Sequence, residues 1–511
     1  MLRPVLAALT LFGSCLCVKY EPTWDSIDSR PLPSWYDDSK FGIFCHWGVY
    51  SVPAFKTEWF WDHWKGKTPD KEVVEYMEKN YRPGFSYADF AHEFRAEDFS
   101  AKKFADIVKS SGAKYFVFTS KHHEGFTMWP SPTSWNWNSV DIGPHRDIVG
   151  ELKTEFSKTD IHFGLYFSQF EWFHPYYMLP NSTLYPERIS YPQMLEIVNR
   201  YQPDVIWSDG DWDQTDEYWR SKEFLAWLYN ESPVKDKVVV NDRWGHEIMG
   251  HHGGFLTYSD HYDPGHLLAR KWENCLTLDV QSWGHRRAMR ASDVRTTKDL
   301  ISQLARTISC GGNMLLNFGP DKFGNINPIF EERLAELGKW VNANEEAIFG
   351  SKPWIYQNDS DDIWYTSKLR QATNSASRYF VFNAQTKANT IIYAFVTKIP
   401  SDNVVKLPSV GHTAQVWDFT EAFLHRIQLK VSILSTKTSL NVVKESQGIS
   451  VDLSSIPWQI PSSEALVLKI EYAATVYNVN PIKRLEKMGM LDAAGHPTKK
   501  AKNVVSLHRD F

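Results

Sequence analysis

The feature that most constrains the fold is a regular alternation of short apolar runs with helical stretches between residues 40 and 351. Short apolar runs bounded by Gly and acidic residues are typical of buried parallel strands. Eight such runs are present, at residues 41–46, 114–119, 162–168, 204–209, 237–242, 255–260, 275–280 and 313–318. Helical patterns lie at residues 100–111, 147–157, 191–201, 222–229, 297–309 and 330–344. This alternation predicts an α/β fold with a (β/α)8-like barrel over residues 18–351, distorted after the fifth and sixth runs, where helical patterns are weak.

The composition changes after residue 351. Short β-rich runs at residues 379–384, 390–396, 414–417, 448–453 and 465–471 alternate with turn residues and lack a helical period. This pattern predicts a small antiparallel β-sandwich over residues 352–475. Residues 476–511 carry seven Lys or Arg against three Asp or Glu, and we expect them to form a basic surface extension.

The first 17 residues have the pattern of a secretory signal peptide. Arg3 precedes an apolar stretch from residue 5 to residue 12, and small residues follow at Ser14, Cys15 and Cys17. The stretch is too short to span a membrane, and no later apolar segment is long enough to do so. We therefore expect cleavage after Cys17, passage through the secretory pathway and a lysosomal or secreted product.

Three cysteines remain after this cleavage, and they allow at most one disulfide bridge. They are Cys45, Cys275 and Cys310. Three Asn-x-Ser/Thr sequons predict N-glycosylation along the secretory route. They begin at Asn181, Asn230 and Asn358, and Pro233 directly after the second one disfavours modification there.

The composition excludes some classes of function. Hydrophobic residues at 42% and charged residues at 23% indicate a globular protein with a sizeable core. A net charge of −5 gives no support for nucleic-acid binding. The 22 tryptophans suit either a large core or a cleft in which the C–H faces of sugar rings stack on indoles.

The ends of the predicted strands bring polar and aromatic side chains to one face of the barrel. The fourth run ends in Trp207-Ser208-Asp209-Gly210-Asp211-Trp212. A lone Asp at a strand end is usually a solvated cap, but a carboxylate between two tryptophans favours a sugar-binding site, because barrels place catalytic groups there. The other strand ends contribute His46, His122, His123, Tyr166, Arg243 and Asp260.

The three histidines raise the question of a metal site. His122 and His123 are adjacent and point to opposite sides of a strand, and neither a His-x-His nor a His-Glu-x-x-His spacing occurs. We therefore expect no metal and no cofactor. Neutral imidazoles that donate and accept hydrogen bonds to sugar hydroxyls are the favoured interpretation.

The acidic cluster indicates the reaction class. The sequence has no Gly-x-Ser-x-Gly elbow, P-loop or dinucleotide fingerprint. Carboxylates among Trp, His and Tyr in a secreted barrel favour glycoside hydrolysis by a carboxylate pair.

Several motifs in the same order resemble the α-L-fucosidases, glycoside hydrolase family 29. They are Phe41-Gly42-Ile43-Phe44-Cys45-His46-Trp47-Gly48, Glu58-Trp59, Ser120-Lys121-His122-His123-Glu124-Gly125-Phe126, Trp207-Ser208-Asp209-Gly210, and the segment from Pro264 to Lys271-Trp272-Glu273-Asn274-Cys275. The resemblance is strong from Tyr20 to Trp354 and looser beyond. The chain departs from the family at His285, where Tyr is frequent, and in its tail after Val476.

The resemblance implies a retaining exo-hydrolase that releases terminal α-L-fucose from a fucosylated glycan. Asp209 is then the nucleophile, and Cys275 belongs to a signature segment near the site. The positions that match fucose-binding residues are His46, Glu58, His122, His123, Tyr166, Trp207 and Arg243.

Two residues compete for the role of general acid/base. Asp260 stands at the carboxyl end of the sixth predicted strand and is preferred, because strand-end carboxylates face the substrate. Glu273 precedes the seventh predicted strand, where Lys271 offers it an ion pair, and it remains the alternative.

A catalytically inactive, lectin-like protein that binds fucose is the competing hypothesis. It predicts that the nucleophile or a ring-binding residue is missing, and all of them are present. A structural or nucleic-acid-binding role disagrees with the acidic balance and the signal peptide. The linkage preference and the size of any homo-oligomer are left open by the sequence.

Overall fold

The structure is a computed structural model that describes residues 19–370, 390–410, 429–456 and 464–473, together with positions 486, 489, 491, 492 and 498. The predicted signal peptide, the predicted strands at 379–384 and 414–417 and most of the predicted tail lie outside the described residues.

A seven-stranded parallel sheet forms the centre of the larger part of the chain. Its order is β5 (Val239–Val240), β4 (Val205–Asp209), β3 (His162–Ser168), β2 (Tyr115–Lys121), β1 (Phe41–Cys45), β7 (Gly312–Phe318) and β6 (Trp272–Thr277). The strands are buried on both faces, as expected of a sheet covered by helices. The α/β barrel-like class predicted from the sequence is therefore confirmed.

The prediction of eight strands is wrong in detail. The predicted strand at 255–260 forms only an isolated bridge, between Leu256 and Trp272. β6 begins three residues before the predicted strand at 275–280, because the ladder to β7 runs from Trp272 to Thr277. The predicted strand at 237–242 shrinks to the two residues of β5.

The short segment around Leu256 nonetheless connects the two edges of the sheet. The Phe255 amide donates to the Val240 carbonyl at 3.0 Å. On the other side, the Leu256 amide donates to the Lys271 carbonyl at 2.9 Å, and the Glu273 amide donates to the Leu256 carbonyl at 2.8 Å. The barrel therefore closes through two residues between β5 and β6.

Helices cover the outside of this sheet, most of them where the sequence predicts them. The larger helices are α5 (Ala101–Ser110), α6 (Ile148–Phe156), α7 (Tyr191–Tyr201), α9 (Ser221–Asn230), α10 (Thr297–Ser309) and α11 (Pro328–Ala343). α4 (Lys71–Asn80) is as long as α5 and α9. The shorter helices are α1 (Trp24–Asp28), α2 (Ser34–Ser39), α3 (Phe60–Lys65), α8 (Asp216–Trp219) and α12 (Glu345–Ile348). Ser, Thr and Asp side chains cap several N-termini, as at α10, where Thr296 and Asp299 form a capping box.

The C-terminal part consists of two antiparallel sheets with their own apolar core. The larger sheet has the order β12 (Lys430–Ile433), β15 (Leu466–Glu471), β10 (Thr390–Val396), β9 (Ile363–Leu369) and β8 (Lys352–Ser360). The smaller sheet has the order β11 (Val404–Leu407), β14 (Ile449–Asp452) and β13 (Asn441–Lys444). These sheets match the predicted β-rich class of this region.

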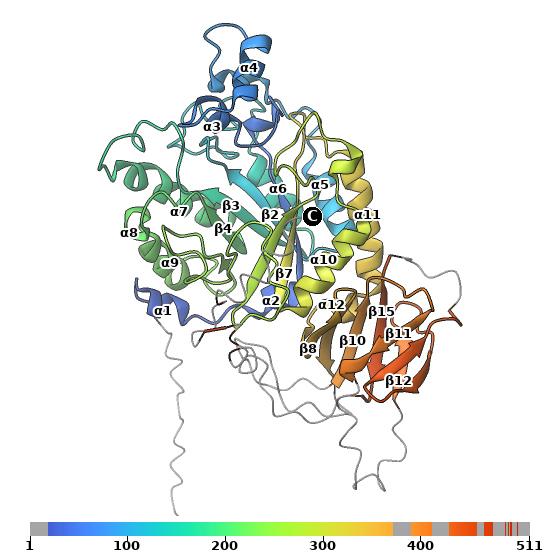
Figure 1. Cartoon of the computed structure of the whole chain (residues 1–511). Helices are drawn as coiled ribbons and strands as arrows, with labels where there is room; N and C mark the ends of the chain where they lie inside the picture. Colours follow the sequence, from blue (N-terminus) through green and yellow to red (C-terminus); the bar gives the residue numbers. More distant parts are fainter. Residues whose placement is uncertain are drawn as a thin grey trace, which may run out of the picture.

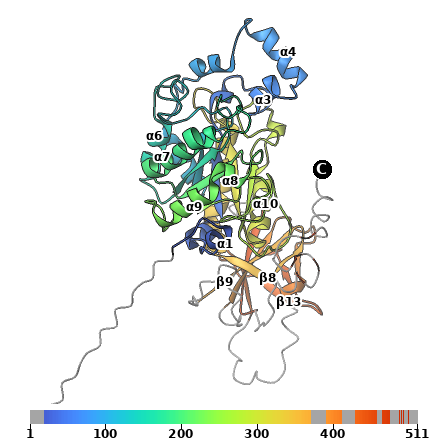
Figure 2. The same cartoon turned by 90° about the vertical axis from the view of Figure 1, so that its left-hand side faces the viewer.

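The two parts lie end to end (Figure 1). α3 and α4, which follow β1, cover the end at which the parallel strands finish, and the antiparallel sheets lie at the opposite end (Figures 1 and 2). Trp340 of α11 donates to the Ala465 carbonyl at 3.0 Å, and so ties the helix to the sheets. Within the described residues, no helix is both long and apolar enough to cross a membrane.

A buried charge cluster joins β8 to the N-terminal end of the barrel. The carboxylate of Asp37 accepts from Lys40 at 2.8 Å, from Lys271 at 2.6 Å and from Lys352. Burial alone raises the pKa of Asp37, but the lysines outweigh it and hold that pKa well below its ordinary value. Burial lowers the pKa of Lys40, whose side chain is fully enclosed. One carboxylate thus compensates several buried ammonium groups.

We expect Asp37→Asn to lower the free energy of unfolding by about 3 kcal/mol, because it leaves a buried lysine without its counter-ion. The matched control is Glu75→Gln, which removes an exposed ion pair with Lys71 and should cost no more than about 0.5 kcal/mol. Urea denaturation followed by tryptophan fluorescence measures both. Equal stability of the two variants would contradict the importance assigned to the cluster.

Candidate active site

Asp209 is the last residue of β4, and its carboxylate lies at the carboxyl end of the barrel strands. The chain turns at Gly210 with a φ of 66°, a left-handed conformation that favours glycine, and a Cβ there would lie 2.7 Å from Ser168 Oγ. Tyr166 OH donates to Asp209 Oδ2 at 2.8 Å, and Arg243 Nη1 donates to Oδ1 at 2.9 Å. Only 8% of Asp209 is exposed, so these donors fix its orientation.

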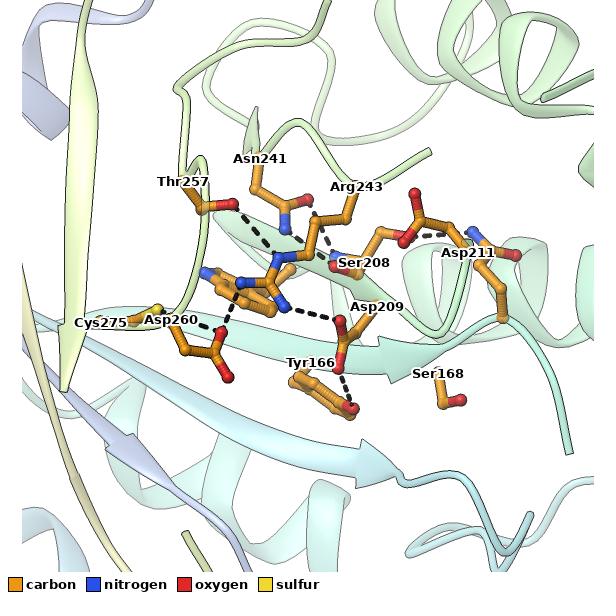
Figure 3. Close-up of polar contacts among 12 residues, drawn as sticks. Tyr166, Ser168, Ser208, Asp209, Asp211, Asn241, Arg243, Thr257, Asp260 and Cys275 are labelled. Atoms are coloured by element: carbon orange, nitrogen blue, oxygen red, sulfur yellow. Dashed lines mark hydrogen bonds and ion pairs between the residues drawn. The ribbon is translucent and has the colours of Figure 1, made fainter. Parts of the chain in front are cut away.

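Arg243 lies between two carboxylates (Figure 3). Its second terminal nitrogen donates to Asp260 Oδ1 at 2.5 Å, and its guanidinium lies 4.6 Å from the centre of the Trp207 ring. Burial opposes the charged form, but Asp260 and Asp209 outweigh it and hold the pKa of Arg243 well above its ordinary value. Carboxylates bound to two nitrogens of one guanidinium are necessarily close neighbours.

A buried hydrogen-bond chain holds Arg243 in place. Thr257 Oγ1 donates to Asp242 Oδ1 at 2.7 Å and accepts from Arg243 Nε at 3.2 Å. Asp242 also accepts from the Gly250 amide at 2.8 Å. Since Asp242 is fully buried, burial raises its pKa. These hydrogen bonds fix the plane of the Arg243 guanidinium.

Asp260 lies on the irregular segment that follows the barrel closure, not at the end of a strand. Its neighbours Tyr258 and His261 have φ values of 54° and 55°, which are strained for residues with side chains. The His261 amide donates to the Cys275 carbonyl at 2.9 Å and so ties this segment to β6. The Asp260 side chain is 44% exposed. Burial raises its pKa, but Arg243 outweighs burial and lowers it.

Glu273, the alternative candidate, lies within β6 and points into the barrel interior. It accepts hydrogen bonds from Tyr36 OH at 2.6 Å, Tyr115 OH at 2.7 Å and Trp207 Nε1 at 2.9 Å. Its exposed fraction is zero, and burial raises its pKa. The expected ion pair with Lys271 is wrong, since Lys271 binds Asp37.

Two buried histidines have tautomers fixed by their neighbours. Asn317 donates through its amide nitrogen to the Trp283 carbonyl at 2.7 Å, so its oxygen accepts from His46 Nδ1 at 2.7 Å. Ser168 donates to the Phe170 carbonyl at 2.8 Å, so its hydroxyl accepts from His123 Nδ1 at 2.8 Å. In each ring, Nε2 is therefore the acceptor.

Both imidazoles are held neutral. Burial and His122 lower the pKa of His46 to about 3. Burial, followed by His122 and His46, lowers the pKa of His123 well below its ordinary value. His123 Nε2 lies 3.7 Å from Asp209 Oδ2, so its acceptor nitrogen faces the region around the nucleophile candidate.

Glu58 completes this wall of the site. Its Oε2 accepts from Ser282 Oγ at 2.9 Å and from the backbone amides of Trp283 at 3.0 Å and Gly284 at 3.1 Å. Burial raises the pKa of Glu58, but nearby His122 and His46 outweigh burial and lower it. His122 is buried, and its ring centre lies 5.8 Å from that of His46 and 5.7 Å from that of Tyr166.

The three cysteines in the described part of the chain form no disulfide. Cys45, Cys275 and Cys310 are all free and buried, so the one bridge that the sequence allowed is absent among them. Burial raises the pKa of the Cys275 thiol, and its sulfur lies 3.9 Å from Asp260 Oδ1.

A cavity of about 670 Å³ opens beside the two carboxylates. It is lined by Asp211, Trp212, Arg243, Gly245, Glu247, Met249, Ser259, Asp260 and His261. Burial and the charge of Asp209 raise the pKa of Asp211 to about 7. Asp211 Oδ2 accepts from the Gly245 amide at 2.7 Å, which fixes its carboxyl group in the cavity wall.

The predicted sequons differ in their surroundings. Asn181 and Asn358 are exposed. Asn230 exchanges two hydrogen bonds with the Tyr20 backbone, at 2.7 and 2.9 Å, so its amide is already engaged.

Sequence reasoning missed the residues that orient the predicted ones. Asn317, Thr257 and Asp242 were not among the predicted site residues, yet they set the His46 tautomer and the Arg243 plane. A polar residue inside an apolar strand, as in Leu315-Leu316-Asn317-Phe318, is a signal for such a role. Among the described residues, no group of three or more His, Cys, Asp or Glu side chains is arranged to hold a metal ion.

The chain is similar to known alpha-L-fucosidases over most of its length. A putative alpha-L-fucosidase from Caenorhabditis elegans is 58% identical over 471 residues, which cover 91% of this chain and 95% of that protein. The plasma alpha-L-fucosidase of Homo sapiens is 47% identical over 445 residues, which cover 85% of this chain and 88% of that protein.

The fold matches solved structures as well. The alpha-fucosidase of Thermotoga maritima in complex with a mechanism-based inhibitor superposes with a TM-score of 0.69 at 29% identity, covering 88% of this chain and 100% of that one. The sequence model of the alpha-L-fucosidase family matches residues 16–346. With the carboxylates, histidines and barrel in place, the chain belongs to the alpha-L-fucosidase family.

Proposed function

We propose that the chain is a retaining exo-hydrolase that releases terminal α-L-fucose from glycoproteins, glycolipids or oligosaccharides. The observation that carries the proposal is the contact of one guanidinium, that of Arg243, with the carboxylates of Asp209 and Asp260. A retaining mechanism uses two carboxyl groups about 5–5.5 Å apart, one as nucleophile and one as acid/base. Membership of the family supports fucose as the sugar.

Asp209 attacks the anomeric carbon of fucose and forms the covalent intermediate. Its donors, Tyr166 and Arg243, fix the orientation of the carboxylate. Trp207 stacks under Arg243 and thereby supports its position. A preorganised anion close to the ring also stabilises an oxocarbenium-like transition state.

Asp260 gives a proton to the departing oxygen and later takes one from water. Its half-exposed position supports this role over Glu273, whose carboxylate is enclosed by three donors inside the barrel. Before the attack, Asp209 and Asp260 share the charge of Arg243, so its hold on the Asp260 carboxylate is weaker than it would be without Asp209. Once Asp209 is esterified, Arg243 stabilises Asp260 as the carboxylate, the form that a general base needs.

The remaining polar groups bind the sugar hydroxyls. His46 and His123 present Nε2 as acceptors, and Glu58 offers a fixed carboxylate beside His122. Cys275 acts through Asp260 and does not attack the substrate, because burial raises its thiol pKa. A lectin-like protein without catalysis would not require a carboxylate pair on one arginine.

The mature protein reaches the lysosome or the cell exterior through the secretory pathway. The apolar N-terminal segment supports this route, as do the plasma and tissue origins in the names of relatives. Asn181 and Asn358 are the favoured glycosylation sites, since the Asn230 amide is engaged by Tyr20.

Asp209→Gly should lower kcat by at least about a thousandfold, because the covalent path is removed. Added azide should restore part of the turnover and give the β-configured fucosyl azide. The matched control is Asp213→Gly, an exposed aspartate four residues on, which should retain activity. Near-normal turnover by the Asp209→Gly enzyme would rule out this nucleophile.

Asp260→Ala should abolish hydrolysis of natural fucosides and spare aryl fucosides with acidic phenol leaving groups, which need no proton. Azide should then give the α-configured product. Glu273→Gln should instead lower thermal stability, without a dependence on the leaving group, because it disturbs a buried network. If Glu273→Gln shows the leaving-group dependence and Asp260→Ala does not, the two roles are exchanged.

Dialysis against a strong chelator should leave hydrolysis of an aryl α-L-fucoside unchanged, since no group of three or more His, Cys, Asp or Glu side chains in the described part of the chain is arranged to hold a metal ion. Rates are compared before dialysis, after dialysis and after addition of zinc. A loss that zinc restores would establish a catalytic metal and overturn the hydroxyl-binding role of His46 and His123.

A further inference from the structure

The cavity beside the carboxylate pair is distinct from the histidine-lined wall. Arg243 and Asp260 line it, whereas none of the three candidate histidines, Glu58 or Tyr166 does. Its volume of about 670 Å³ exceeds what one pyranose ring needs and lies in the usual range of ligand sites. It therefore adjoins the fucose position without being part of it.

One wall of the cavity is an exposed apolar surface that is rigidly supported. Trp212 is 37% exposed and Met249 is 41% exposed, although both are large apolar side chains. The Trp212 ring is stacked on Trp59 with centres 6.0 Å apart and planes at 11°, and Phe170 meets it edge-on at 5.2 Å. An indole fixed in this way presents a preformed platform for the C–H face of a sugar.

The other side chains that line the cavity are largely polar or acidic. Asp211, Glu247, Ser259 and His261 face the same space. The two loops that carry Trp212 and Glu247 are tied together, since His246 Nδ1 lies 3.0 Å from the Trp212 carbonyl and the His246 amide donates to the Gln214 carbonyl at 2.8 Å. The carboxylates of Glu247 and Asp260 suit the hydroxyls of a neutral sugar and repel an anionic one.

We propose that this cavity is the leaving-group site, that it takes a neutral hexopyranose which carries the fucose, and that Trp212 is its specificity-determining platform. The proposal rests on the proposed function, because the oxygen that Asp260 protonates belongs to the leaving sugar. That sugar must lie against Asp260, and the cavity is the space that Asp260 borders.

The test compares two substrates with the same fucose and different leaving groups. α-L-Fucosyl fluoride releases only fluoride, which cannot reach Trp212, whereas an α-L-fucosyl-galactose disaccharide fills the cavity. Trp212→Ala should lower kcat/KM for the disaccharide by about tenfold relative to the fluoride, because one stacking contact is lost. Trp212→Phe should restore most of this ratio.

The matched control is Trp135→Ala, which removes a tryptophan that is 79% exposed and does not line the cavity. It should leave the disaccharide-to-fluoride ratio unchanged. An unchanged ratio in Trp212→Ala, or an equal fall for both substrates, overturns the leaving-group site while the proposed function stands. Failure of the unaltered protein to hydrolyse fucosyl fluoride contradicts the proposed function and this inference with it.

Discussion

The arrangement of the site depends on a carboxylate buried inside the barrel. Glu273 would be costly there without partners, and Tyr36, Tyr115 and Trp207 satisfy it from α2, β2 and β4. Gly42 in β1 makes room for this network, since a Cβ there would lie 2.4 Å from the Tyr115 ring. Because Trp207 is held by Glu273 and in turn supports Arg243, the interior network sets the position of the catalytic surface above it.

Arg243 is shared by two carboxylates, and the proposed mechanism needs their charges at different moments. A cation between them couples their protonation, so the loss of charge on one favours the ionised form of the other. Thr257 and Asp242 prevent the guanidinium from following either partner. The geometry therefore allows one residue to serve both halves of a double displacement without moving.

The sequence was sufficient to predict elements that have a local sequence pattern. It was insufficient to predict elements whose form depends on how the barrel closes. β4 and its terminal Asp209 follow from an apolar run that ends just before Gly210, and α10 follows from the helical pattern at residues 297–309. The prediction of a full strand at 255–260 was wrong, because only Phe255 and Leu256 make the backbone hydrogen bonds that close the barrel. The environment of Glu273 was not predictable either, since its three donors lie at least 66 residues away in the chain.

The two carboxylates lie on different kinds of backbone, because the barrel closes through only two residues between β5 and β6. Asp209 ends a strand that is paired on both sides, whereas Asp260 stands on the irregular chain just after Phe255 and Leu256. Changes in the irregular segment can reshape the space around Asp260 without disturbing Asp209 or the strand that carries it. Under the proposed mechanism, the choice of leaving sugar can therefore change while the covalent step stays the same.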